Sequence, residues 1–249
     1  MARNTAIMYK CINIAIIIIA TLIMCSCDIY FVEVENLKKW NAGAVVSTEA
    51  IKIYGEDKVF VSSNITKDIY DRIYGKSYKT DCIVPLTDLC YLKILHYDIA
   101  GDIRLGEMIC NKMIANDLMS IFRELYKAKY PIERMILIDE YNANDEVSMS
   151  NNNSSSFNYR MITGGGKLSK HALGLAVDIN PLYNPYVKVL PNGLLHIEPS
   201  NAHLYVDRST DFDYKIDSSD LCYKLFIRHG FEWGGDWETR KDYQHFEKR

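Results

Sequence analysis

The chain has 249 residues, of which 48% are hydrophobic and 24% are charged, and its formal net charge is −3. These fractions are ordinary for a soluble globular protein. The small negative charge gives no basic surface for nucleic acid, so we expect no nucleic-acid partner. Once the N-terminal segment is set aside, the length suits one domain of medium size on a short stalk.

Residues 1–27 have the pattern of a bacterial lipoprotein signal peptide. Arg3 and Lys10 supply positive charge, and residues 12–24 form an almost unbroken apolar run. This run is short for a membrane span and suits the core of a signal peptide. A serine precedes Cys27, which predicts cleavage before Cys27 and a lipid on that cysteine. A plain secretory signal and an uncleaved anchor are the alternatives, and all three export the domain. A lipid at Cys27 or an uncleaved anchor would hold it in the cell envelope at the membrane.

The next segment, residues 28–79, is interpreted as a tether or an N-terminal extension without chemistry of its own. Residues 44–53 and 58–62 are rich in β-branched side chains, which favours short strands. Residues 64–74 are expected to form a short helix. The packed domain is expected from about residue 80 onward.

Four cysteines lie beyond the signal region, and no two of them form a C-x-x-C pair. This spacing does not indicate a structural zinc site or a redox motif. Each is expected to be a small buried hydrophobic side chain. They are Cys82, Cys90, Cys110 and Cys222.

The clearest secondary structure lies in the first half of the packed domain. Residues 97–106 alternate apolar and polar side chains around a turn, which predicts a hairpin. A helix is predicted from an N-cap at Asn111 to about residue 129, just before Pro131. Its apolar residues recur at spacings of three and four, which places them on one face: Ile114, Leu118, Ile121, Phe122 and Leu125.

A buried strand is predicted over residues 131–139, followed by a polar loop over residues 142–156. By composition this loop could link two domains. Because functional loops often lie beside a binding site, we expect it to rim the active site and to direct Arg160 inward. A second long helix is predicted over residues 219–230.

The stretch from Ser169 to Asn180 places His171 and Asp178 on one short, mostly apolar segment. Imidazole nitrogen and carboxylate oxygen are ligand types that Zn²⁺ accepts in catalytic sites. Alone, this pair would be a weak signal. His245 near the C-terminus supplies a third ligand, which leaves one coordination position for water.

A zinc ion lowers the pKa of a bound water from about 15.7 to about 7, and a carboxylate must then accept and return its proton. Asp242 is the candidate, because it lies three residues before His245 and faces the same side if the chain turns there. Arg160 is the candidate cation for the tetrahedral oxyanion. Asp236 is a rival carboxylate, but its Gly-Gly-Asp-Trp context is more typical of a turn, with the tryptophans packing or flooring the cleft. The other histidines are interpreted as surface or packing residues: His96, His196, His203 and His229.

The pattern Ser169-x-His171-x-x-Gly174-x-Ala176-x-Asp178, followed by Asp242-x-x-His245, resembles the D-alanyl-D-alanine carboxypeptidase family of zinc peptidases. That family includes VanY-type carboxypeptidases, VanX-type dipeptidases and L-alanyl-D-glutamate endopeptidases, and it shares a superfamily with lysostaphin-type peptidases and the hedgehog signalling domain. The resemblance covers the chain from about residue 81 to the C-terminus.

The resemblance implies a zinc peptidase domain over residues 80–249 that hydrolyses peptidoglycan stem peptides with one zinc ion per chain. His171, Asp178 and His245 would be the ligands, Asp242 the acid/base and Arg160 a residue that binds substrate and transition state. The implied fold is α+β, a small antiparallel sheet with flanking helices and the zinc in a surface cleft.

Asp242 also bears on the branch of the family. Many of the carboxypeptidases and dipeptidases carry Glu at this position, whereas Asp resembles the L-alanyl-D-glutamate endopeptidases. The surroundings at residues 157–160 and 233–237 also resemble that branch. The substrate class is therefore better indicated than the bond cleaved.

Two other classes of function agree less well with the sequence. A zinc-stabilised cell-wall-binding domain without catalysis is the main alternative, but Asp242 and Arg160 are both retained and favour an enzyme. A hydrolase with a serine or cysteine nucleophile is disfavoured because the chain has no nucleophile elbow.

Overall fold

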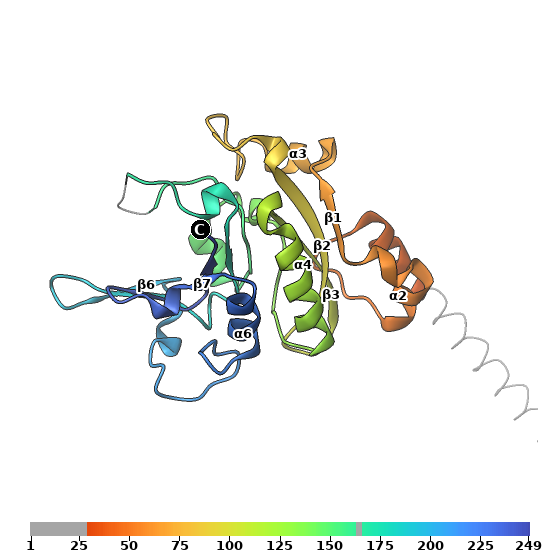
Figure 1. The fold of residues 1–249 in the computed structure, drawn as a ribbon. Coiled ribbons are helices and arrows are strands. Elements are labelled where there is room, and N and C mark those ends of the chain that lie inside the picture. Colours follow the sequence, from red (N-terminus) through yellow and green to blue (C-terminus); the bar gives the residue numbers. More distant parts are fainter. Residues whose placement is uncertain (1–28, 163–165) are drawn as a thin grey trace, which may run out of the picture.

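The computed structural model describes residues 29–162 and 166–249 (Figure 1). The predicted signal peptide, with its lipid site at Cys27, lies outside the described residues. Within the described ranges, no helix is long and apolar enough to cross a membrane. The predicted α+β class is confirmed, since helices accompany three small antiparallel sheets in this part of the chain, ordered β1-β2-β3, β4-β9-β7 and β6-β5-β8.

The first sheet and its helix form the largest regular unit. β1 (Val61–Asn64), β2 (Leu89–Tyr97) and β3 (Ile103–Asn111) are antiparallel. The predicted turn within residues 97–106 joins β2 to β3, but the two strands extend well beyond that range, to residues 89 and 111. α4 (Lys112–Lys127) follows directly, and the Asn111 side chain caps it by accepting a hydrogen bond from the Met113 backbone N–H, as expected. The predicted apolar stripe of α4 is buried against one face of β2 and β3. Burying each such side chain contributes about 1.5–3 kcal/mol.

Residues 29–59 and 65–79, which flank β1, cover the other face of the same sheet (Figure 1). Their buried side chains share a core with β2 and β3, and the Trp40 indole N–H donates to the Gly106 carbonyl at 3.0 Å. The strand predicted over residues 44–53 is wrong, because α2 (Thr48–Tyr54) forms there, capped by the Ser47 hydroxyl. The predicted short helix is confirmed as α3 (Lys67–Ile73). The domain boundary at residue 80 stays a prediction.

The chain between α4 and the metal-ligand motif is mostly irregular. The strand predicted over residues 131–139 is wrong: this stretch makes isolated bridges and ends in a 3₁₀ helix, Ile138–Tyr141. The Asn153 side chain replaces a strand partner by bonding the Ile136 backbone N–H and carbonyl at 2.9 and 3.0 Å. The predicted polar loop contains a short helix, α5 (Asp145–Ser150), capped by Asn144.

The C-terminal part has short strands joined by long connections. A buried side chain organises the longest of these: the Asn184 Oδ1 accepts from the Ile216 backbone N–H at 2.8 Å and from Arg208 at 3.1 Å. The predicted second helix is confirmed as α6, with bounds shorter at each end. The elements are β4 (Ala176–Asp178), β5 (Tyr186–Val189), β6 (Leu195–Glu198), α6 (Leu221–Arg228), β7 (Glu232–Trp233), β8 (Lys241–Asp242) and β9 (His245–Glu247).

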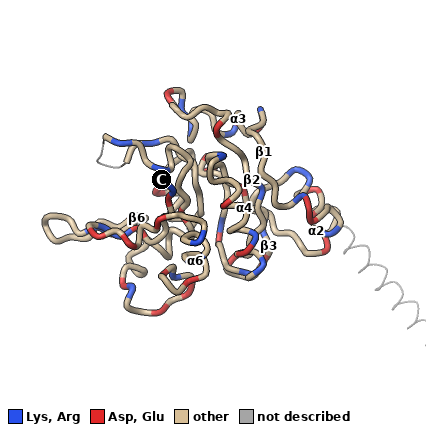
Figure 2. The backbone as a smooth tube through the Cα atoms, in the orientation of Figure 1, with Lys and Arg blue, Asp and Glu red and all other residues tan. Residues whose placement is uncertain are grey.

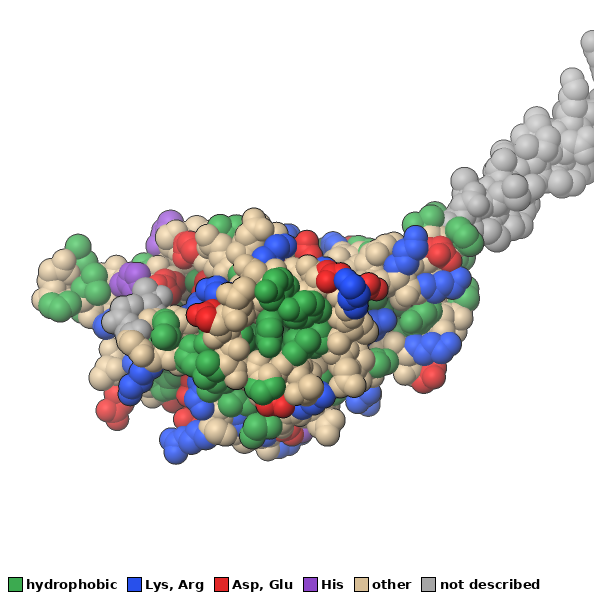
Figure 3. Space-filling view, turned by 90° about the horizontal axis from the view of Figure 1, so that it is seen from above, with side chains coloured by type: hydrophobic (Ala, Val, Ile, Leu, Met, Phe, Trp, Pro, Cys, Tyr) green, Lys and Arg blue, Asp and Glu red, His purple; other side chains and the backbone are tan. Residues whose placement is uncertain are grey.

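Charged residues of both signs are interspersed along the chain, as expected for a net charge of −3 (Figure 2). The β5–β6 hairpin projects from the body of the molecule (Figure 1). Its tip carries apolar side chains, since Val189 is 65% and Leu194 64% exposed, and it forms one end of the view in Figure 3.

Candidate metal centre

The strand register of the second sheet brings two predicted ligands together. β4 and β9 are antiparallel, and Asp178, the last residue of β4, lies directly opposite His245, the first residue of β9. Cross-strand neighbours on one face have Cβ atoms about 4.5–5.5 Å apart, close enough to share a small ion. Residues as distant as 178 and 245 in sequence thus become neighbours through three pairs of β residues.

His171 comes from a 3₁₀ helix, His171–Leu173, that ends at Gly174. Gly174 has φ +66°, a left-handed conformation that glycine adopts without strain. A Cβ at this position would lie 2.7 Å from the Asn111 backbone nitrogen, which donates to the Gly174 carbonyl at 2.9 Å. The glycine therefore joins the site to the N-terminus of α4 and turns the chain from His171 into β4.

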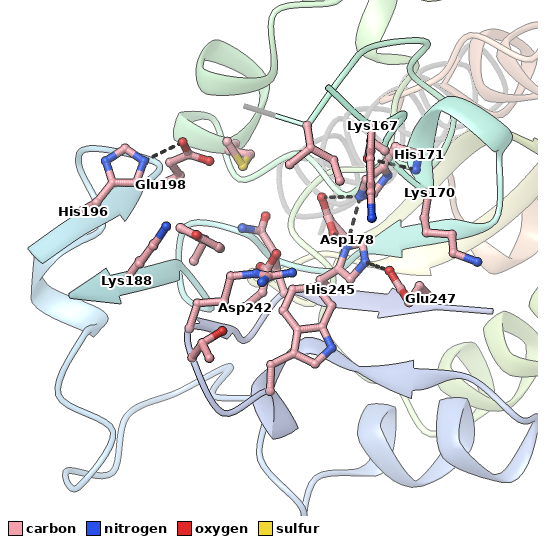
Figure 4. Close-up of a pocket in the computed structure, with 18 of the residues that line it drawn as sticks. Lys167, Lys170, His171, Asp178, Lys188, His196, Glu198, Asp242, His245 and Glu247 are labelled. Atoms are coloured by element: carbon pink, nitrogen blue, oxygen red, sulfur yellow. Dashed lines mark hydrogen bonds and ion pairs between the residues drawn. The ribbon is translucent and has the colours of Figure 1, made fainter. Parts of the chain in front are cut away.

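Three ligand atoms converge in this arrangement (Figure 4). His171 Nε2 lies 3.1 Å from His245 Nδ1 and 3.2 Å from an Asp178 oxygen, and His245 Nδ1 lies 3.0 Å from the other Asp178 oxygen. Ligands about 2.0–2.1 Å from a tetrahedral Zn²⁺ stand about 3.3–3.4 Å apart. The separations and the two-histidine, one-carboxylate donor set therefore fit a single zinc ion.

Each histidine is held by a contact at its other nitrogen. His171 Nδ1 donates to the Ser156 carbonyl at 2.7 Å, which leaves Nε2 to face the other ligands. His245 Nε2 lies 3.0 Å from Glu247 Oε2. Ser156 belongs to the polar loop that was predicted to lie beside the site. A backbone carbonyl of that loop therefore orients the His171 ring.

The protonation states of Asp178 and His245 depend strongly on neighbouring side chains of the site. Burial would raise the pKa of Asp178, but His171 and His245 outweigh it and hold this pKa well below its usual range. Burial would lower the pKa of His245, but hydrogen bonds to Asp178 and Glu247 outweigh it and raise this pKa to about 10. The carboxylate is therefore ionised at neutral pH, and metal binding must release a proton from His245.

Asp242 stands at the end of β8, and residues 243–244 turn the chain into β9. This is the turn that the sequence argument required. Burial is the main reason that the pKa of Asp242 is raised to about 6, and the nearby Asp178 carboxylate adds to the shift, although His245 opposes it. Asp242 Oδ1 is buried and has no hydrogen-bond partner among the described residues.

The Gly-Gly-Asp-Trp segment forms the predicted turn, a 3₁₀ helix over Gly234–Asp236. Gly234 lies against Asp242: a Cβ there would be 2.6 Å from the Asp242 carbonyl oxygen. Trp233 packs in the core, whereas Trp237 lines the pocket, so the two tryptophans take the two roles expected of them.

Arg160 lines the same pocket as the three ligands and Asp242. The structure also shows what the sequence did not: Arg160 forms an ion pair with Asp145 of α5, and Asn158 donates to the other Asp145 oxygen at 2.8 Å. The predicted cation is therefore beside the site but is already paired with one carboxylate.

The pocket has a volume of about 790 Å³, and part of its wall was missed by the sequence analysis. β5 and β6 place alternate residues on the pocket side, where Lys188 is opposite His196 and Tyr186 is opposite Glu198. His196, which was interpreted as a surface or packing residue, lines the pocket 2.8 Å from Glu198. The sequence signal that could have identified this part of the pocket wall is the alternation of residue types along β5 and β6.

Comparison with known families gives one match. Residues 163–248 match the model of a family described as D-alanyl-D-alanine carboxypeptidase, and this range contains all three ligands and Asp242. Comparisons with curated proteins and with solved structures found no match. Residues 163–248 thus carry a domain of the D-alanyl-D-alanine carboxypeptidase family, a family of peptidases, and its His-Asp-His group is consistent with a metallopeptidase.

Proposed function

We propose that this protein is a zinc-dependent peptidase that hydrolyses the stem peptides of peptidoglycan. The observation that carries the proposal is the convergence of His171 Nε2, His245 Nδ1 and the two Asp178 oxygens, with contacts of 3.0–3.2 Å between residues. They lie beside a buried Asp242 oxygen that has no hydrogen-bond partner among the described residues. Such a set supplies both a metal site and a base. The family match adds peptides of the cell wall as the substrate class.

His171, Asp178 and His245 would hold the zinc ion. The bound ion would supply an acidified water and polarise the scissile carbonyl. Asp242 would accept a proton from the attacking water through Oδ1 and would return a proton to the amine nitrogen as the C–N bond breaks. Burial raises the pKa of Asp242 to about 6 in the metal-free protein, which makes it a stronger base than an exposed aspartate while leaving it ionised at pH 7.

Arg160 is proposed to stabilise the negative charge that develops on the carbonyl oxygen. Its ion pair with Asp145 fixes the guanidinium at the pocket wall. A charged donor that is already oriented needs no reorganisation when the transition state forms. Asp145 is then the residue that positions this cation.

We further propose that the bond cleaved is that between L-alanine and D-glutamate. The support is Asp242, since aspartate at this position resembles the endopeptidase branch. Removal of a terminal D-alanine is the alternative within the same family.

We also propose that the protein acts in the cell envelope. The support is the sequence of residues 1–27, which has the pattern of a signal peptide with a lipid site at Cys27. Stem peptides lie outside the cytoplasmic membrane, so the proposed substrate and the proposed location agree.

The test is to incubate the purified protein and Zn²⁺ with defined muropeptides and to identify the products by mass spectrometry. Separation of L-alanine from the rest of the stem is expected, and loss of a terminal D-alanine would instead indicate a carboxypeptidase. Addition of a chelator should abolish hydrolysis at whichever bond is cleaved, and so should the His171→Ala substitution. A protein that binds zinc and stem peptide but releases no product would be a cell-wall-binding domain.

A further inference from the structure

The two histidines of the metal centre present different nitrogens. His171 turns Nε2 toward the common centre, whereas His245 turns Nδ1 toward it. A neutral imidazole carries its proton on one nitrogen, and only the other can bind a metal. Each ring therefore needs an acceptor that holds the proton on the nitrogen facing away from the centre.

For His171 this acceptor is the Ser156 carbonyl oxygen, which holds the proton on Nδ1 and leaves Nε2 available to a metal. His245 is in a less favourable position. Its metal-facing Nδ1 lies 3.0 Å from Asp178 Oδ1, and a carboxylate at that distance stabilises a proton on Nδ1. That tautomer cannot bind a metal. A second acceptor of equal strength is needed at Nε2.

Glu247 provides that acceptor. Its Oε2 lies 3.0 Å from His245 Nε2, on the side of the ring away from Asp178 (Figure 4). His245 and Glu247 are alternate residues of β9 and therefore project from the same face of the strand. Their side chains are 7% and 20% exposed, so water screens this contact only weakly.

The backbone fixes Glu247 in place. β9 is the central strand of its sheet, and Glu247 is paired with Ala176 of β4 on one side and with Glu232 of β7 on the other. Lys170 donates to the carbonyl of the following residue, Lys248, at 2.9 Å. The carboxylate thus sits on a strand held along both edges, as a positioning group requires.

We propose that Glu247 is a positioning residue that keeps the proton of His245 on Nε2 and so presents Nδ1 to the metal. This inference rests on the zinc site of the proposed function. Removing such an outer partner of a ligand histidine lowers metal affinity about 10- to 100-fold in other proteins. Glu247→Leu, which retains volume but has no acceptor, is expected to show a loss in this range.

The test measures the Zn²⁺ dissociation constant of the full chain by competition with a chromophoric chelator, and the absorption spectrum of the Co²⁺-substituted protein. Glu247→Gln retains an acceptor oxygen and should recover most of the affinity lost in Glu247→Leu. Glu247→Ala should show the same loss as Glu247→Leu and serves in its place if the leucine variant does not fold.

Glu232→Ala is the matched control. Glu232 is the cross-strand neighbour of Glu247, its side chain is 45% exposed, and it is paired with Arg249 rather than with a histidine. Its removal deletes the same charge from the same sheet and should leave zinc affinity and the Co²⁺ spectrum unchanged.

Unchanged zinc affinity in Glu247→Leu, or an equal loss in Glu232→Ala, would overturn the role of Glu247. A wild-type protein that binds no zinc would instead overturn the metal site of the proposed function. The two failures are therefore distinguishable.

Discussion

Two regions of the molecule differ in how their backbone N–H and carbonyl groups are hydrogen-bonded: the β1-β2-β3 sheet with α4, and the two C-terminal sheets. β2 and β3 share nine register pairs, and apolar side chains cover both faces of the hairpin. In the C-terminal part, β4 and β9 share three pairs, and β5 and β8 share two. Much of the remaining backbone there is bonded by polar side chains such as Asn184 and Arg208.

We infer from this difference that the β1-β2-β3 sheet and α4 contribute mainly to stability, whereas the C-terminal sheets position the residues of the candidate site. Apolar burial is non-directional and scales with the area removed from water, so it suits a scaffold. A metal site needs donors placed within fractions of an ångström, which hydrogen bonds and strand register can specify. We therefore expect changes in the scaffold to lower the free energy of unfolding, and changes in the site to lower activity with little effect on folding.

The largest effect is expected from Asp242→Ala. Loss of a general base lowers the rate of hydrolysis about 10²- to 10⁴-fold, while zinc binding should persist because Asp242 is not one of the ligand atoms. Muropeptide hydrolysis and zinc titration of the same preparation measure the two. Full activity in this variant would remove Asp242 from the mechanism.

On the scaffold side, Phe122→Ala should lower the free energy of unfolding by about 3–5 kcal/mol. Phe122 is 1% exposed on the buried face of α4. Denaturant unfolding measures the change, and Met113→Ala on the same helix is the control, because Met113 is 73% exposed and should change stability by less than about 0.5 kcal/mol. Equal losses in the two variants would show that burial of Phe122 against the sheet does not stabilise the scaffold.

Gly174→Ala should affect both properties, because Gly174 joins the scaffold to the site. Its positive φ and its close approach to Asn111 predict a loss of about 1–3 kcal/mol in the free energy of unfolding, with weaker zinc binding as His171 shifts. Gly193→Ala is the control: its φ is +81°, but a Cβ there meets nothing within 4 Å. Zinc affinity reduced equally in both would mean that Gly174 has no special connection to the site.

The smallest effect is expected from pH. Asp242 must be ionised to accept a proton, so kcat/KM should rise with pH through an acid limb whose midpoint is at or below about 6, since a bound cation lowers this pKa further. With a midpoint of about 6, lowering the pH from 7 to 5 reduces kcat/KM about tenfold. A kcat/KM profile over this range measures it, and far-UV circular dichroism checks that the protein stays folded. A limb centred above pH 7 would point to a different base.

Local patterns in the sequence predicted the elements that are stabilised locally. The apolar stripe and Asn111 cap were sufficient to predict α4. The alternation over residues 97–106 predicted the turn between β2 and β3 but not the length of either strand. Residues 44–53 were assigned as a strand from their β-branched side chains, but the cap at Ser47 and its contact with Glu33 favour a helix there. The pairing of short strands far apart in sequence has no local pattern, so three sheets were not foreseen.

The candidate site shows the same limit. The spacing of His171, Asp178 and His245 identified residues that the structure brings together. The contacts behind them, such as the Ser156 carbonyl and Glu247, depend on the backbone path and could not be derived from residue types. The ion pair of Arg160 with Asp145 was hidden for the same reason, because α5 lay within a stretch expected to be an irregular loop.

The position of β9 has a consequence for biosynthesis. β9 is the last strand of the described chain, yet it lies in the middle of its sheet and carries His245, which contacts a residue 67 positions earlier. A ribosome makes β4 and β7 first, and their shared partner must then enter between them. A nascent chain that stops before residue 245 lacks one of the three residues of the candidate metal centre. The candidate metal centre can therefore be completed only after residue 245 has been synthesised.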